Sequence, residues 1–292
     1  MRVLVIGDGI IDNYLHGTNN RMSPENQEVP IFDINKSEYR LGGAFNVATN
    51  IKSLSCGLRI YVSTCYISLF TFGLLSTKNI DPKLCGFSFR SLYEPEWNCE
   101  LIKTRLFDLK TNKQVIRLDN QKKFHQDHVE QYHRLLEKLL EKFAFDVVVV
   151  SDYSKGTIDR WLINRLSKLN IPMFVDTKKT DFSIWPNRDN TFFKINFKEW
   201  SEAKNWKELK NLIVTRGSLP VFYYQNGEIV NRTNVEQIER PDVTGCGDVF
   251  LAALAVEYLE VKDINMSIDF ATKAATVSAT KFGTCEVKRS EI

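Results

Sequence analysis

The chain has 292 residues, of which 43% are hydrophobic and 26% are charged. This composition supports a sizeable core and argues against wholesale disorder. Basic and acidic residues nearly balance at a net charge of +3, which leaves no electrostatic case for binding nucleic acid or an anionic membrane. A local basic pocket for a phosphorylated substrate is compatible with this balance.

The N-terminal part of the chain predicts a buried strand followed by a small β excursion. The apolar run Val3 to Ile6 ends at a glycine, as buried parallel strands do, and is too short for a signal-peptide core. Turn-forming and extended residues follow, which predict a β lid at about residues 13–40. The stretch Ile60 to Leu75 is shorter than the roughly 18 residues of a membrane-spanning helix. We therefore expect a buried strand and helix there, and a cytoplasmic protein.

The second half of the chain alternates short apolar runs with segments of helical periodicity. Strands are expected at 145–151, 172–175, 192–195 and 212–215, and helices at about 127–140, 161–169, 248–258 and 268–281. The alternation predicts a doubly wound, mostly parallel α/β sheet with helices on both faces, in a single domain over residues 1–292. Such sheets bind ligands at the carboxyl ends of their strands. The polar residues expected there are Asp8, Asp152, Asp176, Asn196 and Arg216.

The strongest chemical signal is the stretch Asp242-Val243-Thr244-Gly245-Cys246-Gly247-Asp248, which runs directly into an apolar helix. Because glycines flank Cys246, consecutive backbone N–H groups can converge on one anion, and the helix dipole favours negative charge there. A carboxylate at Asp248 then lies beside that anion. Phosphoryl transfer to an alcohol needs this pair: donors for the migrating group, and a base for the hydroxyl proton. The alternative is a structural loop in which Asp248 caps the helix.

Other nucleotide-binding motifs are absent from the sequence. No G-x-x-x-x-G-K-[ST] loop occurs, and Gly7-Asp8-Gly9 lacks the third glycine of a dinucleotide fingerprint. The stretch 242–248 instead resembles the D-[TV]-T-G-A-G-D signature of the ribokinase/PfkB carbohydrate kinases. Residues 41–48 resemble the family's G-G-x-x-x-N-x-A element, and Phe282-Gly283-Thr284 with Val287 resembles its closing element. The resemblance implies a ribokinase-like fold, ATP and Mg²⁺ as cofactors, and a lid that closes over the sugar and excludes water.

Further stretches resemble those family members that phosphorylate D-glycero-D-manno-heptose 7-phosphate at C1. They are residues 21–25, 103–105, 116–119, 151–156 and 176–182. This resemblance implies a sugar phosphate as the acceptor. The alternatives are a kinase for another sugar, namely ribose, fructose or a nucleoside, and a non-catalytic paralogue that binds a sugar or a nucleotide.

The family motifs imply roles for individual residues around the transferred phosphoryl group. Asp248 is implied as the catalytic base, and the backbone amides of Gly245, Cys246 and Gly247 as the anion hole. The family's N-x-x-E element organises Mg²⁺ and phosphates, with its glutamate acting on the metal indirectly. It is matched here by Asn196 and Glu199, and the strand end beside the nucleotide is matched by Thr215, Arg216 and Gly217.

The resemblance also implies the acceptor site. Sugar hydroxyls are expected to bind to Asp12, Gly42, Gly43 and Asn46. Cations suit the phosphate end of the sugar, and the candidates are Lys103, Arg105 and Lys178, with surface charge as the alternative interpretation. Lys103 and Arg105 alternate with their neighbours, so in a strand they would point to the same face.

Three positions depart from the family pattern. No G-x-D-x-x-G stretch occurs within residues 63–79, the anion-hole alanine is Cys246, and the proline of the D-P-K element is Thr177. These changes indicate either an altered substrate site or a paralogue that has lost activity. The bare strand edges of the lid also predict pairing with a second subunit, as a homodimer.

Overall fold

A computed structural model describes residues 1–55, 57–65, 101–120 and 126–292. The described strands form two sheets. The larger has the order β12-β11-β10-β9-β8-β7-β1-β4. Its strands are β1 (Arg2–Gly7), β4 (Arg59–Ser63), β7 (Val147–Asp152), β8 (Met173–Thr177), β9 (Thr191–Asn196), β10 (Asn211–Arg216), β11 (Leu219–Gln225) and β12 (Glu228–Thr233).

The larger sheet is parallel from β4 to β10, and the strands β11 and β12 join its edge in antiparallel orientation. Next to its edge strand β4, Val5 of β1 pairs with Val62 on one side and with Val149 on the other. Both neighbours are apolar because the strands are covered on both faces. The predicted doubly wound, mostly parallel α/β class is confirmed.

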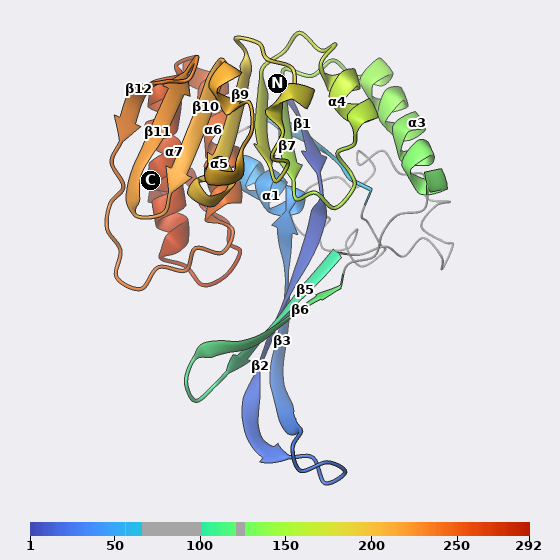
Figure 1. Ribbon diagram of the computed structural model, residues 1–292, viewed down its shortest axis with the longest axis vertical. Coiled ribbons are helices and arrows are strands. Elements are labelled where there is room, and N and C mark those ends of the chain that lie inside the picture. Colours follow the sequence, from blue (N-terminus) through green and yellow to red (C-terminus); the bar gives the residue numbers. More distant parts are fainter. Residues whose placement is uncertain (56, 66–100, 121–125) are drawn as a thin grey trace.

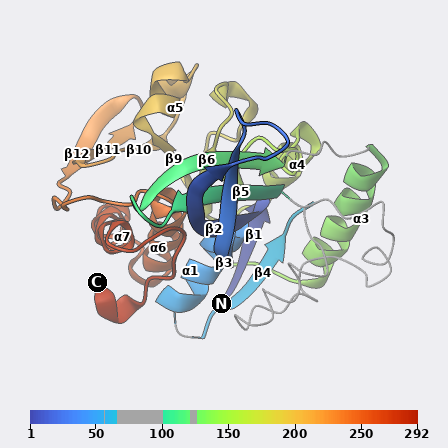
Figure 2. The same ribbon diagram turned by 90° about the horizontal axis from the view of Figure 1, so that it is seen from below.

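Helices cover both faces of this sheet (Figures 1 and 2). One face carries α1 (Ala44–Leu54), α6 (Cys246–Val261) and α7 (Ile264–Ala279). The other carries α3 (Gln126–Lys142) and α4 (Arg160–Leu166). A short helix, α5 (Phe197–Glu202), follows β9. No helix in the described part of the chain combines the length and apolarity that crossing a bilayer requires.

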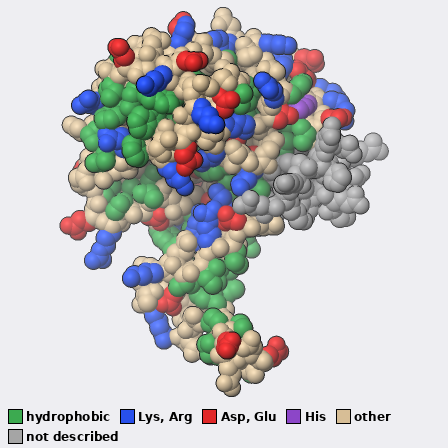
Figure 3. Space-filling model, in the orientation of Figure 1, with side chains coloured by type: hydrophobic (Ala, Val, Ile, Leu, Met, Phe, Trp, Pro, Cys, Tyr) green, Lys and Arg blue, Asp and Glu red, His purple; other side chains and the backbone are tan. Residues whose placement is uncertain are grey.

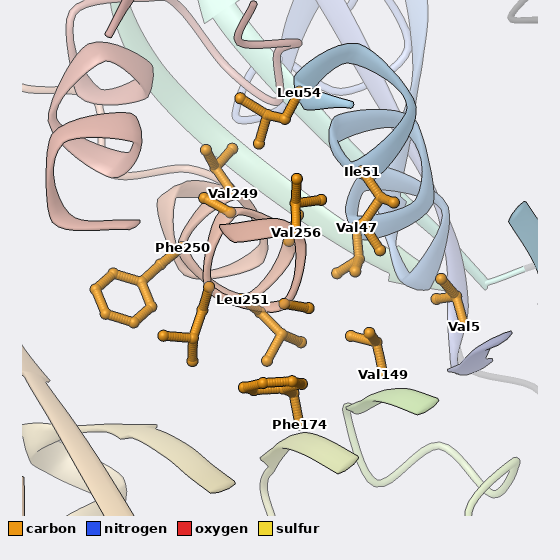
Figure 4. Packing of buried hydrophobic residues seen from close by; sticks show 14 of the residues in the cluster. Val5, Val47, Ile51, Leu54, Val149, Phe174, Val249, Phe250, Leu251 and Val256 are labelled. Carbon is orange, nitrogen blue, oxygen red and sulfur yellow. The ribbon is translucent and has the colours of Figure 1, made fainter. Parts of the chain in front are cut away.

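Helix α6 is the centre of one core layer (Figure 4). Its residues are apolar on almost every side, and all but one of those between Asp248 and Leu259 are buried. Val47 and Ile51 of α1 pack beside it, and Phe174 of β8 lies beneath it. Removing a fully buried ring such as that of Phe174 typically costs about 3–5 kcal/mol. This packing holds the first turn of α6, which contains Asp248, rigidly over the sheet.

A second sheet of four strands projects from one end of the main body (Figure 1). Its strands are β2 (Gly9–Met22), β3 (Pro30–Gly43), β5 (Leu101–Asp108) and β6 (Lys113–Asn120), in the order β3-β2-β5-β6. It contains the lid expected at residues 13–40 and also strands from residues 101–120. The parallel pairing of β2 with β5 joins segments about 90 residues apart, which local patterns do not reveal.

The stretch Ile60 to Leu75 is described only in part. Its first residues lie in β4, as expected for a buried strand, whereas residues 66–75 lie outside the described residues. The same limit applies to the missing G-x-D-x-x-G stretch, of which only residues 63–65 are described.

Candidate active site

The carboxyl ends of the parallel strands meet at one edge of the larger sheet, as the alternating pattern predicts. Asp8 directly follows β1, and Asp176 is the second-to-last residue of β8. The last residues of β7, β9 and β10 are Asp152, Asn196 and Arg216. Asp8 is fully buried and accepts backbone N–H groups from Tyr153, Lys155 and Thr157. The burial of Asp8 raises the pKa of its carboxyl group. The residue therefore organises the loop after β7.

Asp248 lies in the first turn of α6 and is buried. Its Oδ2 accepts from Asn46 Nδ2 at 3.1 Å, and its Oδ1 accepts from the hydroxyl of Tyr153 at 2.8 Å. Burial raises the pKa of Asp248 to about 6, although both hydrogen bonds act to lower it. A carboxylate with a pKa close to neutrality is well suited to general-base catalysis.

The glycines before Asp248 permit close approaches to the loop. Gly245 begins α6 with a φ of +78°, a conformation that favours glycine, and a Cβ there would lie 2.8 Å from Asn46 Nδ2. At Gly247 a Cβ would lie 2.8 Å from Lys194 Nζ. The N–H of Cys246 donates to the carbonyl of Val243 at 3.3 Å, so the turn itself uses this amide. Gly245 and Gly247 are therefore the better candidates for anion binding at the N-terminus of α6.

The expected sugar-hydroxyl residues lie on β2, β3 and α1. Asp12 forms a buried ion pair with Arg105 of β5, so this guanidinium is engaged by a carboxylate. A Cβ at Gly42 would collide with the Asp12 carboxylate, and Gly43 has a φ of +55°. Glycine at both positions lets β3 pass directly beside Asp12 before the chain enters α1.

The expected phosphate-binding cations do not all converge. Lys103 Nζ lies 4.7 Å from the centre of the Tyr153 ring, and Lys178 Nζ lies 5.5 Å from it. Burial lowers the pKa of Lys103. The prediction that Lys103 and Arg105 share a face of one strand agrees with their places in β5, but Arg105 contacts Asp12 and the ring of Tyr14 instead of Tyr153.

The chain is similar to known proteins in sequence and in fold. A family model described as pfkB family carbohydrate kinase matches residues 162–290. The bifunctional protein HldE of Helicobacter pylori strain J99 is 31% identical over 100% of this chain and 65% of its own length. HldE of Escherichia coli O9:H4 strain HS is 29% identical over 99% of this chain and 62% of its own. Residues 162–290 thus match the pfkB family of carbohydrate kinases, and the whole chain is similar to HldE. The chain spans less than two thirds of the length of these HldE relatives.

Two solved structures share the fold of this chain. Escherichia coli phosphofructokinase-2 in complex with potassium superposes with a TM-score of 0.75 at 15% identity, over 100% of this chain and 96% of that one. Thermotoga maritima ribokinase gives a TM-score of 0.62 at 16% identity, over 99% and 97%. At these identities the likeness establishes the ribokinase-like fold alone.

The residues that match the family's nucleotide elements lie at the ends of β9 and β10. Asn196 caps α5, and its side chain and that of Glu199 form a reciprocal capping box. Glu199 also forms an ion pair with Lys178. Thr215 and Arg216 end β10, and Gly217 follows with a φ of +62°. The guanidinium of Arg216 lies 4.2 Å from the centre of the Phe222 ring.

This edge of the sheet fits a magnesium ion held indirectly. Mg²⁺ usually binds through one or two carboxylates and completes its shell with water and substrate phosphates. Within the described ranges, no group of three or more His, Cys, Asp or Glu side chains forms a metal cage. Asp176 Oδ1, however, is buried without a hydrogen-bond partner, and Glu199 lies in the first turn of α5, directly after the neighbouring strand β9. A bound Mg²⁺ would neutralise phosphate charge here.

Two departures from the family pattern have structural explanations. Thr177, at the proline position, donates its hydroxyl to the buried Asp152 carboxylate at 2.6 Å. The thiol of Cys246 points to Asp242 O and Ser278 Oγ, at 3.4 and 3.7 Å, and burial raises its pKa to about 11. The thiol is therefore protonated and adds no negative charge beside the anion site.

The sequence interpretation missed two side chains that contact the site. Tyr153 bonds the expected base, and Lys194 forms a buried 2.6 Å ion pair with Asp176 beside Gly247. Tyr153 lies in residues 151–156, one of the stretches that resemble heptose phosphate kinases. The resemblance points to this segment but does not indicate that Tyr153 contacts the base. The lone lysine in the apolar run of β9 was an available signal for Lys194, because a cation in a buried strand requires a partner.

Proposed function

We propose that this protein transfers the γ-phosphoryl group of ATP, with Mg²⁺, to a hydroxyl of a sugar or sugar phosphate. The specific acceptor we propose is D-glycero-D-manno-heptose 7-phosphate, phosphorylated at C1. The observation that carries the proposal is the position of Asp248. A buried carboxylate with a pKa of about 6 lies one residue beyond a glycine loop at the N-terminus of a 16-residue helix.

The proposed reaction is a direct in-line displacement. Asp248 accepts the proton of the attacking sugar hydroxyl, while Asn46 holds the carboxylate in place. The amides of Gly245 and Gly247, together with the dipole of α6, bind the migrating phosphoryl group. Asp12 accepts a hydroxyl of the sugar. The projecting sheet closes over the sugar and excludes water, which limits ATP hydrolysis.

The proposal of a phosphorylated acceptor rests on Lys103 and Lys178. Both ammonium groups lie against the Tyr153 ring, close to the base. The charge of Lys178 is shared with Glu199, so Lys103 is the main cation that suits a dianionic acceptor better than a neutral one. Arg105, which the sequence placed with them, has a different role in this proposal, because its charge is matched by Asp12. It holds Asp12 in position for the sugar.

A screen of ATP consumption against sugars and sugar phosphates tests the proposal. We expect turnover with a sugar phosphate, and Lys103→Met should raise its KM strongly while leaving the KM for ATP nearly unchanged. The matched control is Lys138→Met, an exposed lysine of α3. Preference for neutral ribose, fructose or a nucleoside would remove the heptose phosphate proposal and keep the sugar kinase. Ligand binding without turnover on any acceptor would favour the non-catalytic paralogue.

We also propose a homodimer formed through the projecting sheet. All eight residues of the edge strand β6 are exposed, including Val115, Ile116 and Leu118. Hydrophobic side chains are visible along this sheet in Figure 3. An exposed apolar edge strand pairs readily with another strand, and a second copy offers a matching one. Sedimentation of Leu118→Glu tests this: the variant should be monomeric where the parent protein is dimeric.

A further inference from the structure

The loop after β7 presents one side chain to the expected base. The hydroxyl of Tyr153 donates to Asp248 Oδ1 at 2.8 Å, across 95 residues of sequence. The backbone N–H of Tyr153 donates to Asp8 Oδ2 at 2.8 Å. Lys155 and Thr157 donate to the same buried carboxylate at 3.0 and 3.1 Å. The phenol is therefore anchored both at its backbone and at its hydroxyl.

The surroundings of Tyr153 keep its hydroxyl protonated, so that it acts as the donor in the hydrogen bond to Asp248. Burial and the adjacent Asp248 carboxylate raise the pKa of the phenol well above its usual value. The phenol consequently keeps its proton at neutral pH and can only donate to an ionised Asp248. Lys103 and Lys178 lie 4.7 and 5.5 Å from the ring centre, within the range at which a cation is attracted to an aromatic ring.

We propose that Tyr153 is a positioning residue for the base Asp248. Its hydroxyl orients the carboxylate and stabilises the ionised form, which is the form that can accept a proton. Asn46 donates to the other carboxylate oxygen, so the two donors together fix the plane of the carboxylate. This inference rests on the proposed phosphotransfer for its catalytic meaning, but the coupling between the two side chains can be measured without any substrate.

The groups that face Asp248 set its titration. The charged ones and the thiol are Asp176 of β8, Lys194 of β9, Lys103 of β5, Lys178 after β8, and Cys246 of α6; α1 contributes the uncharged Asn46. None of them changes in a Tyr153→Phe variant. Removing the phenol hydroxyl therefore deletes one donor to the carboxylate and should raise the pKa of Asp248.

The substrate-free test is the stability of Tyr153→Phe as a function of pH. Below about pH 4 Asp248 is protonated in both proteins, and the lost hydrogen bond has a small effect. Above pH 6 the parent carboxylate is charged, and a charge-assisted hydrogen bond stabilises the folded protein more than a neutral one does. The difference in Tm between variant and parent should therefore widen as pH rises from about 4.5 to 7.5. A difference that is constant with pH would overturn the proposal.

Tyr223→Phe is the matched control for this experiment. Tyr223 is also buried, and its hydroxyl donates to Asn211 Oδ1 at 2.7 Å, a neutral acceptor. Its loss should lower Tm by the same amount at each pH. A pH-dependent loss in this control equal to that of Tyr153→Phe would also overturn the assignment, because the effect would then not depend on Asp248.

With an active acceptor, the kcat profile gives a second readout. Removing a charge-assisted hydrogen bond should move the acid limb upward by about one pH unit, which lowers kcat about fivefold at pH 6. Near pH 8.5 most of the activity should return, and the KM for ATP should stay within about twofold. An equal loss of kcat at all pH values would indicate a packing role and refute positioning. Failure to find any acceptor would count against the proposed function alone.

Discussion

Asn46 and Asp248, 202 residues apart in the chain, meet in a buried hydrogen bond of 3.1 Å between the side-chain amide and a carboxylate oxygen. One residue lies in the first turn of α1 and the other in the first turn of α6. The two helices pack side by side in the core layer of Figure 4. This contact joins the glycine pair before α1 to the glycine loop before α6, and so unites the proposed sugar and phosphoryl sites.

Asp248→Asn should abolish most of the turnover while the protein still binds ATP. The substitution keeps the size of the side chain and removes the proton acceptor, and general bases typically contribute about 10²–10⁴ in rate. Steady-state kinetics and calorimetric titration with ATP measure the two effects separately. Turnover within a few-fold of the parent would show that another group is the base.

The activity should fall at acidic pH through the titration of Asp248. Its pKa is raised to about 6, chiefly by burial, so the carboxylate is mostly ionised at pH 7 and mostly protonated at pH 5. The profile of kcat/KM against pH should therefore show an acid limb near pH 6. An acid limb below pH 5 would mean that the essential carboxylate is not this one.

Asp248 should also destabilise the folded protein at neutral pH. Its pKa is higher in the folded state than its ordinary 3.8, so the folded state binds the proton more tightly than the unfolded state does. The resulting loss in the free energy of unfolding is absent below pH 3.8 and complete above about pH 6, where it amounts to about 3 kcal/mol. Relative to the parent, Asp248→Asn should thus gain in Tm between pH 4 and 7. A flat difference across that range would contradict the pKa shift.

Gly247→Val should give a folded protein with little activity. A Cβ at this position would lie 2.8 Å from Lys194 Nζ, and a branched side chain would cover the face of the loop where a phosphate must approach. Circular dichroism checks the fold, and ATP consumption checks the activity. Gly247→Ala should show a smaller loss. Normal kinetics in both variants would indicate that this glycine serves only the turn.

Arg105→Ala should lower the stability strongly and weaken acceptor binding. It leaves the buried carboxylate of Asp12 without its partner, and breaking a buried ion pair in this way typically costs about 3–5 kcal/mol. The matched control is Arg117→Ala on the neighbouring strand, whose ion pair with Asp119 is exposed and is expected to contribute at most about 1 kcal/mol. Equal unfolding free energies for the two variants, measured with urea, would contradict this role for Arg105.

Several features of the protein follow from the sequence by itself. The alternating apolar runs predict the mostly parallel sheet, because a strand buried on both faces has to be apolar throughout. The stretch Asp242 to Asp248 runs directly into the apolar part of α6, so the glycine loop and its adjacent carboxylate are local properties of seven consecutive residues. Local backbone preference and solvent exclusion are sufficient to produce both.

Contacts between distant segments were decided only by the tertiary structure. The family resemblance makes Arg105 a candidate for binding a phosphate, whereas the pairing of β2 with β5 places it against Asp12. Tyr153 contacts Asp248, and Lys194 contacts Asp176, through packing of the loops at the strand ends. A buried charge or hydroxyl must find a partner, but its sequence position does not say which segment supplies it. The order of the strands in the folded sheets determines which segment supplies the partner.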